Sequence, residues 1–208
     1  MIPGPGRRWP QRTLLFRLTR GVLFGLFRVL FRFHVEGCER MPSGPAVIVA
    51  NHASALDPLF IGVALPDRVL FVAAQEFLTM RAVGWAMRAY GCIPVRRGEV
   101  DPSAVREALA ALAAGIKVGV FPEGQISPEP TPIRRGAGLL ALRAQVPIIP
   151  VALIGVSRVF PLGARLPRPA RVVVRIGEPV PLPEPTHAAQ EAAVIAAMAW
   201  IRAQVGRP

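Results

Sequence analysis

A histidine and an aspartate five residues apart offer the clearest chemistry in this sequence. His52 and Asp57 lie in the segment Asn51–Asp57, and the whole chain has only three histidines and three aspartates. A carboxylate that accepts a hydrogen bond from one ring nitrogen of an imidazole fixes its tautomer, and the other ring nitrogen can then take a proton from a hydroxyl. The pair is therefore a candidate general base.

The elements around this pair suit that role but also allow a purely structural one. The apolar run 46–50 predicts a buried strand and residues 58–65 predict a helix, so the connecting loop would bring the two side chains together. Alternatively, Asp57 precedes a proline and is a good helix N-cap, or Ser54 caps the helix and Asp57 completes a capping box. His52 would then be an ordinary loop histidine.

After Arg40, short apolar runs alternate with helical patterns. This alternation predicts an α/β fold with a mostly parallel central sheet and flanking helices. Strands are predicted at 46–50, 69–73, 93–95, 118–121, 148–153 and 172–176, and helices at 58–65, 76–90, 103–114, 136–145 and 186–205. In open α/β sheets, ligands bind at the carboxyl ends of the strands. His52, Arg96, Arg97 and Glu123 each follow a predicted strand, so we expect them at that edge.

The first 40 residues predict a segment that associates with membranes. They hold eight arginines and two glutamates, which is half of the net charge of +12. On a helix over residues 13–33, Arg17, Arg20, Arg28 and Arg32 lie on one face and apolar residues fill most of the rest, as in helices that lie at a bilayer interface. The arginines interrupt the apolar run too often for a membrane span. The alternative is a helix that packs on the protein's own core. We expect residues 41–208 to form the α/β domain.

Composition limits the partners and the compartment. The positive charge, carried almost entirely by arginine, favours an anionic partner such as a membrane surface or a phosphorylated substrate. Nucleic acid is not expected, because the aromatic residues gather in the first 33 residues rather than between arginines. The two cysteines form no CxxC and the histidines are scattered, so no metal site or disulfide is expected. Free thiols suit a reducing cytosol, and we expect a peripheral protein at the cytoplasmic face of the membrane.

Four ordered segments together resemble the glycerolipid acyltransferase family typified by 1-acylglycerol-3-phosphate acyltransferase. Asn51–Asp57 resembles the NHxxxxD block of that family, and residues 91–97 (GCIPVRR) resemble its second block. Residues 121–124 (FPEG) resemble the third block, and residues 146–151 (VPIIPV) resemble the fourth. A single HxxxxD is a weak signal, whereas four blocks in order are specific. The resemblance covers about residues 47–153.

The resemblance implies an O-acyltransferase of phospholipid biosynthesis. A fatty acyl group would move from acyl-CoA or acyl-carrier protein to the hydroxyl of a lysolipid, with no cofactor and no metal. His52 would be the general base and Asp57 its orienting carboxylate. The substrate-binding residues would be Asn51, Arg96, Arg97, Glu123, Gly124, Arg134 and Arg135. No GxSxG motif is present, so we expect the acceptor to attack the thioester directly.

One departure from the family pattern bears on the acceptor. The third block of the family usually continues with Thr-Arg-Ser, whose arginine is thought to bind phosphate, but this chain has Gln125-Ile126-Ser127. Isoleucine cannot bind phosphate. Either Arg96 or Arg97, together with Arg134 and Arg135, binds the anion, or the acceptor is another lipid, such as a lyso-ornithine lipid or a glycolipid. A further alternative is a non-catalytic lipid-binding protein on the same scaffold.

Overall fold

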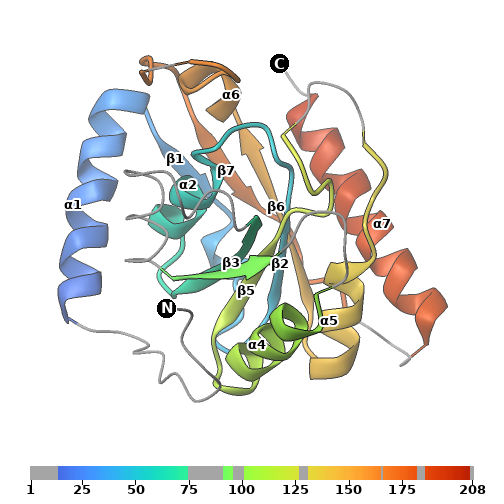
Figure 1. Ribbon diagram of the computed structural model, residues 1–208. Helices are drawn as coiled ribbons and strands as arrows, with labels where there is room; N and C mark the ends of the chain where they lie inside the picture. Colours follow the sequence, from blue (N-terminus) through green and yellow to red (C-terminus); the bar gives the residue numbers. More distant parts are fainter. Residues whose placement is uncertain are drawn as a thin grey trace.

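The computed structural model describes residues 14–74, 91–95, 101–126, 131–164, 166–181 and 186–206. In Figure 1, helices lie on both sides of one twisted sheet. The predicted helix 76–90 and the two arginines Arg96 and Arg97 lie outside the described residues. The remaining predicted strands and helices fall within them.

The described strands form one sheet of seven members in the order β1-β7-β6-β2-β5-β3-β4. Five neighbours, β6, β2, β5, β3 and β4, run parallel, whereas β7 pairs antiparallel with β6, and β1 pairs parallel with β7. The mostly parallel sheet predicted from the sequence is confirmed. The strand bounds are β1 His34–Glu36, β2 Val47–Ala50, β3 Val69–Ala74, β4 Cys92–Val95, β5 Lys117–Val120, β6 Ile148–Ile154 and β7 Val173–Ile176.

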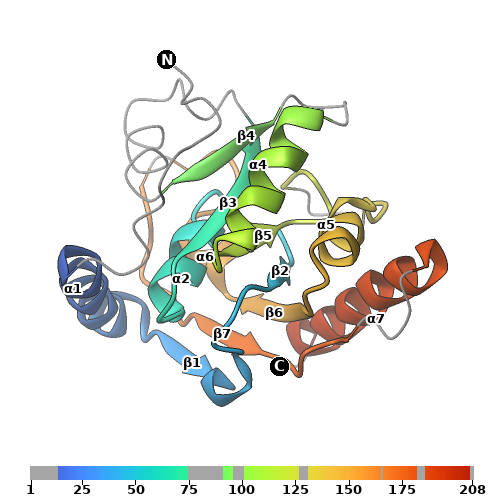
Figure 2. The ribbon, with the colours of Figure 1, turned by 90° about the horizontal axis from the view of Figure 1, so that it is seen from below.

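Helices cover both faces of this sheet, as the view from below in Figure 2 shows. Their bounds are α1 Leu14–Phe31, α2 Asp57–Ala64, α4 Pro102–Ala113, α5 Gly136–Ala144, α6 Val156–Val159 and α7 His187–Val205, with a 3₁₀ turn at Cys38–Arg40. One hydrophobic core joins the sheet to α1, α2 and α6. A second core joins the opposite face to α4, α5 and α7. Because successive strand side chains point to opposite faces, β2 contributes Ile48 to the first core and Val49 to the second.

The helix α1 has two apolar faces rather than one. Phe27 and Phe31 are buried in the first core and pack edge-on against each other. Arg20 also lies on this inward side, where it is half-buried and donates a hydrogen bond to the Ala64 carbonyl oxygen over 3.1 Å. The arginines therefore do not form one exposed stripe as predicted from the helical wheel. The other apolar face is exposed and consists of Leu14, Leu18, Val22, Leu26, Val29 and Leu30.

Residues of the predicted membrane segment 1–40 also take part in the central sheet. The strand β1 pairs with β7 over three residues, His34 to Glu36. Three residues are too few to show a period-2 pattern, which explains why β1 was not predicted. Among the described residues, no helix is long and apolar enough to cross a membrane. The role of this segment at a membrane therefore stays a prediction.

Candidate active site

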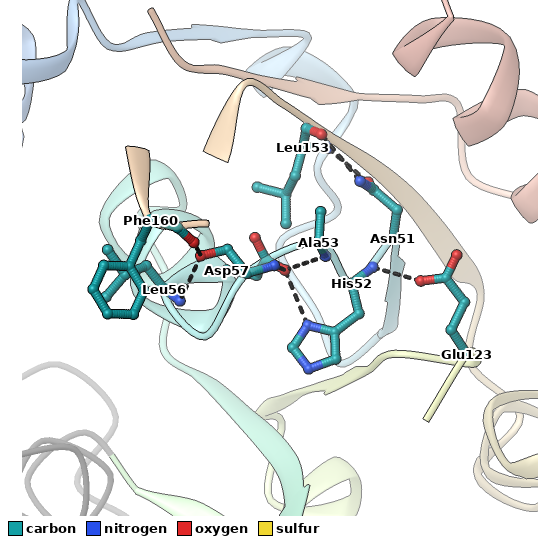
Figure 3. A network of polar contacts seen from close by, with 9 residues as sticks. Asn51, His52, Ala53, Leu56, Asp57, Glu123, Leu153 and Phe160 are labelled. Carbon is teal, nitrogen blue, oxygen red and sulfur yellow. Dashed lines mark hydrogen bonds and ion pairs between the residues drawn. The ribbon is translucent and has the colours of Figure 1, made fainter. Parts of the chain in front are cut away.

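His52 and Asp57 meet where the central strand β2 ends and α2 begins. The strand delivers His52 to the carboxyl edge of the sheet, and the helix starts with Asp57. The Nδ1 atom of His52 lies 2.9 Å from Oδ2 of Asp57, as Figure 3 shows. The second ring nitrogen, Nε2, turns away from Asp57 and takes part in no hydrogen bond among the described residues. The imidazole is thus oriented through one nitrogen and can accept a proton through the other.

The carboxylate of Asp57 is fully buried and accepts three hydrogen bonds through one oxygen. Besides His52, Oδ2 accepts from the backbone N–H groups of Ala53 and Ser54 at 2.7 and 2.8 Å. The other oxygen, Oδ1, has no hydrogen-bond partner among the described residues. Burial raises the pKa of Asp57, and the hydrogen bonds from His52, Ser54 and Ala53 oppose this shift. An anion held here in a poorly polar site attracts a positive charge on the imidazole strongly.

Asp57 performs one part of the capping that the sequence predicts. The N-cap residue of α2 is Leu56, and no side chain caps it, so the interpretation of Asp57 as N-cap is wrong. The bond from Ser54 N–H to Asp57 is one half of a capping box. Ser54 Oγ instead donates to the carbonyl oxygen of Phe160 over 2.9 Å. The same carboxylate oxygen thus shapes the loop and orients the imidazole.

Glu123 holds the backbone of His52 from the turn that follows the neighbouring strand β5. Its Oε2 accepts a hydrogen bond from the His52 backbone N–H over 2.7 Å. Glu123 lies in the turn after β5, closed by the Gly124 N–H bond to the Phe121 carbonyl oxygen, with Gly124 at φ 68°. That φ favours glycine. Since β5 is paired in parallel with β2, their carboxyl ends are adjacent, and residues 71 positions apart meet.

Asn51 fixes the other side of the loop that carries His52. Its side-chain amide accepts from the Leu153 backbone N–H at 2.8 Å and donates to the Leu153 carbonyl oxygen at 3.0 Å. The amide thereby continues the pairing of β2 with β6 by one residue beyond the strand. Asn51 was predicted to bind substrate, but in the structure its polar atoms are engaged with the backbone of β6.

An aromatic ring stacks on the imidazole, a contact that the sequence did not indicate. The ring of Phe121 stacks on His52 with centroids 4.2 Å apart and an interplanar angle of 18°. Phe71 of β3 stacks on Phe121 in turn, at 5.6 Å and 15°. A Cβ at Gly119 would collide with the Phe71 ring, so glycine in β5 makes room for this stack. From the sequence, Phe121 is distinguished only as the first residue of the FPEG block.

Arg134 and Arg135, both predicted to bind substrate, have different surroundings in the structure. Arg134 donates its backbone N–H to the Pro122 carbonyl oxygen at 2.9 Å, and a Cβ at Gly124 would lie only 2.5 Å from its Nε. Its guanidinium therefore covers the turn that holds Glu123. Arg135 instead faces α7, where it pairs with Glu191 at 3.4 Å and lines a pocket of about 430 Å³. The structure thus brings His52, Asp57, Glu123, Gly124 and Arg134 together.

Together, the fold and these residues define an α/β protein with a histidine–carboxylate pair at the carboxyl edge of a parallel sheet. The chain belongs to the acyltransferase family, whose family model, described as "Acyltransferase", matches residues 32–154. The resemblance inferred from the four sequence blocks is confirmed.

Several curated relatives are 1-acyl-sn-glycerol-3-phosphate acyltransferases. The chain is 35% identical over 156 residues to the alpha enzyme of Mus musculus, covering 72% of this chain and 55% of the relative. It is 29% identical over 142 residues to the chloroplastic BAT2 of Brassica napus, covering 64% and 40%. For the enzyme of Bacillus subtilis, identity is 28% over 144 residues, covering 68% and 70%. The chain thus spans about half the length, or less, of the plant and mammalian relatives.

A solved structure supports the fold. The crystal structure of the 1-acyl-sn-glycerophosphate acyltransferase PlsC from Thermotoga maritima superposes with a TM-score of 0.74 at 24% identity. The superposition covers 93% of this chain and 80% of that one. The arrangement of sheet and helices described above is therefore shared with PlsC.

Proposed function

We propose that this protein transfers a fatty acyl group from an acyl thioester to the hydroxyl of a lysolipid, with 1-acylglycerol-3-phosphate as the acceptor. The observation that carries the proposal is the His52–Asp57 pair, with Nδ1 bound to a buried carboxylate and Nε2 without a partner in the part of the chain that the structure describes. The names of the relatives support the reaction and the acceptor. The donor is acyl-CoA or acyl-carrier protein, and both belong in the test.

In the reaction, one proton is transferred twice, first to His52 and then to the leaving thiolate. Nε2 of His52 takes the proton of the acceptor hydroxyl as its oxygen attacks the thioester carbonyl, giving a tetrahedral oxyanion. The Asp57 carboxylate stabilises the imidazolium that forms, and the Phe121 face lies against the same ring. When the intermediate collapses, the carbon–sulfur bond breaks and the imidazolium returns the proton to the leaving thiolate. The ester and the free thiol are the products.

The binding site for the acceptor's phosphate is assigned to Arg134. Its guanidinium lies against Gly124, in the turn that carries Glu123. Glu123 accepts the hydrogen bond from the His52 backbone N–H. Guanidinium groups bind phosphate through paired N–H donors. Ile126, in the position of the family's usual arginine, offers no such donor. Arg96 and Arg97 remain further candidates that follow β4 in sequence.

We propose peripheral attachment to a membrane at its cytoplasmic face, and the exposed apolar face of α1 supports the attachment itself. Six aliphatic side chains of this face are 45 to 80% exposed, although the opposite face of the same helix is buried in the core. The exposed arginines Arg17 and Arg28 lie on the same helix, and no carboxylate occurs between residues 14 and 35. An exposed apolar face with basic neighbours suits an anionic bilayer surface.

The proposal is tested with the purified full chain, both thioester donors and a panel of acceptors. The panel contains 1-acylglycerol-3-phosphate, a lyso-ornithine lipid and a monoacylglycerol. We expect transfer to 1-acylglycerol-3-phosphate and its loss in His52→Ala, with retained binding to anionic vesicles. Absence of transfer from either donor to any acceptor would favour a non-catalytic lipid-binding protein.

A second pair of variants tests the phosphate site. We expect Arg134→Ala to raise KM for the phosphorylated acceptor about 10- to 100-fold, the range for losing a charge-assisted hydrogen bond. The KM for the monoacylglycerol should not change. Arg143→Ala, which removes an exposed arginine from the last turn of α5, serves as the matched control. Equal effects of Arg134→Ala on both acceptors would remove Arg134 from the phosphate site.

A further inference from the structure

The loop between α6 and β7 presents two leucines to solvent. Leu162 is 74% exposed and Leu166 is 76% exposed. Leu162 lies in a turn that the Ala164 N–H closes on the Pro161 carbonyl oxygen, with Gly163 at φ 82°. Single exposed apolar residues are common on protein surfaces. The position and the charge of this loop indicate that these two leucines have a binding role.

The base of the loop is bonded to both the catalytic loop and α1. Ser54 Oγ, next to the His52–Asp57 pair, donates to the Phe160 carbonyl oxygen at 2.9 Å, and Figure 3 shows this contact beside Asp57. At the far end of the loop, the Val172 N–H donates to the carbonyl oxygen of Phe31, the last residue of α1. Across the base, the Arg168 N–H donates to the Val159 carbonyl oxygen over 2.7 Å. The loop therefore lies between the end of α1 and the catalytic edge (Figure 1).

The charge of the loop has a single sign. The loop, residues 160–172, contains three arginines and no aspartate or glutamate, and Arg158 of α6 precedes it. Of these, Arg158, Arg168 and Arg171 are exposed. Exposed aliphatic side chains among arginines, without carboxylates, match the chemistry of an anionic lipid surface: arginine meets phosphate and the aliphatic chains enter the acyl region.

We propose that Leu162 and Leu166 form a second membrane contact, on the same anionic bilayer that α1 binds. Because the loop is tied to α1 at Phe31 and to the catalytic loop at Ser54, insertion at its tip sets the position of His52 relative to the lipid surface. A lysolipid could then present its hydroxyl to Nε2 without leaving the interface completely. This last step rests on the proposed acyltransferase function, whereas the membrane contact itself does not.

Vesicle binding tests the contact without reference to activity. The double variant Leu162→Gln/Leu166→Gln removes the apolar side chains and leaves the charge unchanged. With phosphatidylcholine vesicles containing phosphatidylglycerol, we expect about tenfold weaker binding, since burial of leucine side chains is lost. Ile195→Gln/Val205→Gln on α7, at residues 51% and 43% exposed, is the matched control and should bind as the parent does. Val22→Gln/Val29→Gln in α1 is the positive control.

Two outcomes of this measurement overturn the proposal. One is parental vesicle binding by the loop variant while the α1 variant is weakened; the other is an equal loss in the loop variant and the α7 control. The thermal midpoint of the loop variant should match that of the parent, because its two side chains are exposed.

An activity measurement then separates this inference from the proposed function. With an acceptor held in vesicles, the loop variant should lose transfer about as much as it loses binding. With a short-chain lysolipid below its micellar concentration, its transfer should equal that of the parent. An equal loss with both acceptors would contradict the interfacial role of the loop. If the parent transfers no acyl group, the proposed function fails, and the vesicle binding still decides on the contact.

Discussion

Two buried pairs of a basic and an acidic side chain lie at opposite ends of the same sheet, and only one of them leaves polar atoms without a partner among the described residues. At the carboxyl edge, His52 and Asp57 are 2.9 Å apart. At the amino end of β5, Lys117 Nζ lies 2.8 Å from Oδ2 of Asp67 and donates to the Gly44 carbonyl oxygen at 2.9 Å. Both pairs combine one fully buried partner with one that is partly covered.

The two pairs differ in whether any of their polar atoms lack a hydrogen-bond partner among the described residues. The Lys117 ammonium is 1% exposed and bound to a carboxylate and a carbonyl, which suits a permanent charge in a structural role. The His52–Asp57 pair leaves one ring nitrogen and one carboxylate oxygen without a partner among the described residues. An imidazole nitrogen that has no such partner and can accept a proton is a candidate site for proton transfer. Burial of an acid–base pair alone would not distinguish the two.

The largest effect should come from removing Nε2 and keeping everything else. The variant His52→Asn places an amide N–H near the position of Nδ1, so the hydrogen bond to Asp57 can persist while the proton acceptor is lost. We expect acyl transfer to fall about 10²- to 10⁴-fold, the usual share of a general base. Steady-state rates measure the loss, and urea unfolding checks the fold. A variant that keeps a tenth of the parental rate would show that another group is the base.

The second pair should give the opposite result. The variant Lys117→Met leaves the Asp67 carboxylate without its ammonium, and we expect a loss of about 3 kcal/mol in the free energy of unfolding. Acyl transfer per folded molecule should stay at the parental level. Adding Asp67→Asn should restore part of the stability, because the carboxylate that lost its ammonium is then neutral as well. A fall in activity at unchanged stability would mean that this end of the sheet also contributes to the reaction.

The sequence predicted the local part of the site and missed the part that depends on packing. His52 and Asp57 lie within one strand–loop–helix unit, so their spacing alone brought them together. The hydrogen bond from His52 to Glu123 depends on β2 lying next to β5, and no local pattern encodes that order. The stack of Phe121 on His52 requires the orientation of two rings, which spacing does not show. The burial of Lys117 likewise depends on tertiary contacts that no local pattern reveals.

The fold shows the same division between local pattern and tertiary context. The sheet was predicted because its strands are short apolar runs between helices. The inward position of Arg20 was missed, because the wheel places it among the other arginines and only the neighbouring Ala64 carbonyl explains its burial. Likewise, α1 is neither only a membrane helix nor only a core helix. Its two faces are both apolar, and a hydropathy pattern cannot tell which of them the protein covers.

A smaller effect concerns the pH dependence of stability at Asp57. Burial raises the pKa of this carboxyl in the folded chain above its unfolded value of about 4. Its favourable contribution is therefore complete below the unfolded pKa and is lost as the pH rises through the folded pKa. Asp57→Asn cannot ionise and lacks this loss. Relative to the parent, the variant should gain stability as the pH rises through that window.

Unfolding by urea at several pH values from about 4 upward measures this difference. The control is Asp101→Asn, which changes a carboxylate at the partly exposed N-cap of α4. A stability difference between Asp57→Asn and the parent that stays constant with pH, or that moves in favour of the parent, would contradict the raised pKa. The same variant should also transfer acyl groups more slowly, since a neutral amide stabilises an imidazolium less than a carboxylate does.

The smallest expected effect concerns the orientation of the imidazole rather than its ability to accept a proton. Phe121→Leu keeps an apolar side chain but removes the ring that stacks on His52, and aromatic pairs contribute about 0.5–1.5 kcal/mol. We expect kcat to fall about 2- to 10-fold with little change in KM, because the acceptor's binding groups stay in place. Phe71→Leu, one ring further from His52, should lower kcat less. An equal fall for both variants would mean that the stack only stabilises the fold, whereas a graded fall would show that Phe121 positions the catalytic ring.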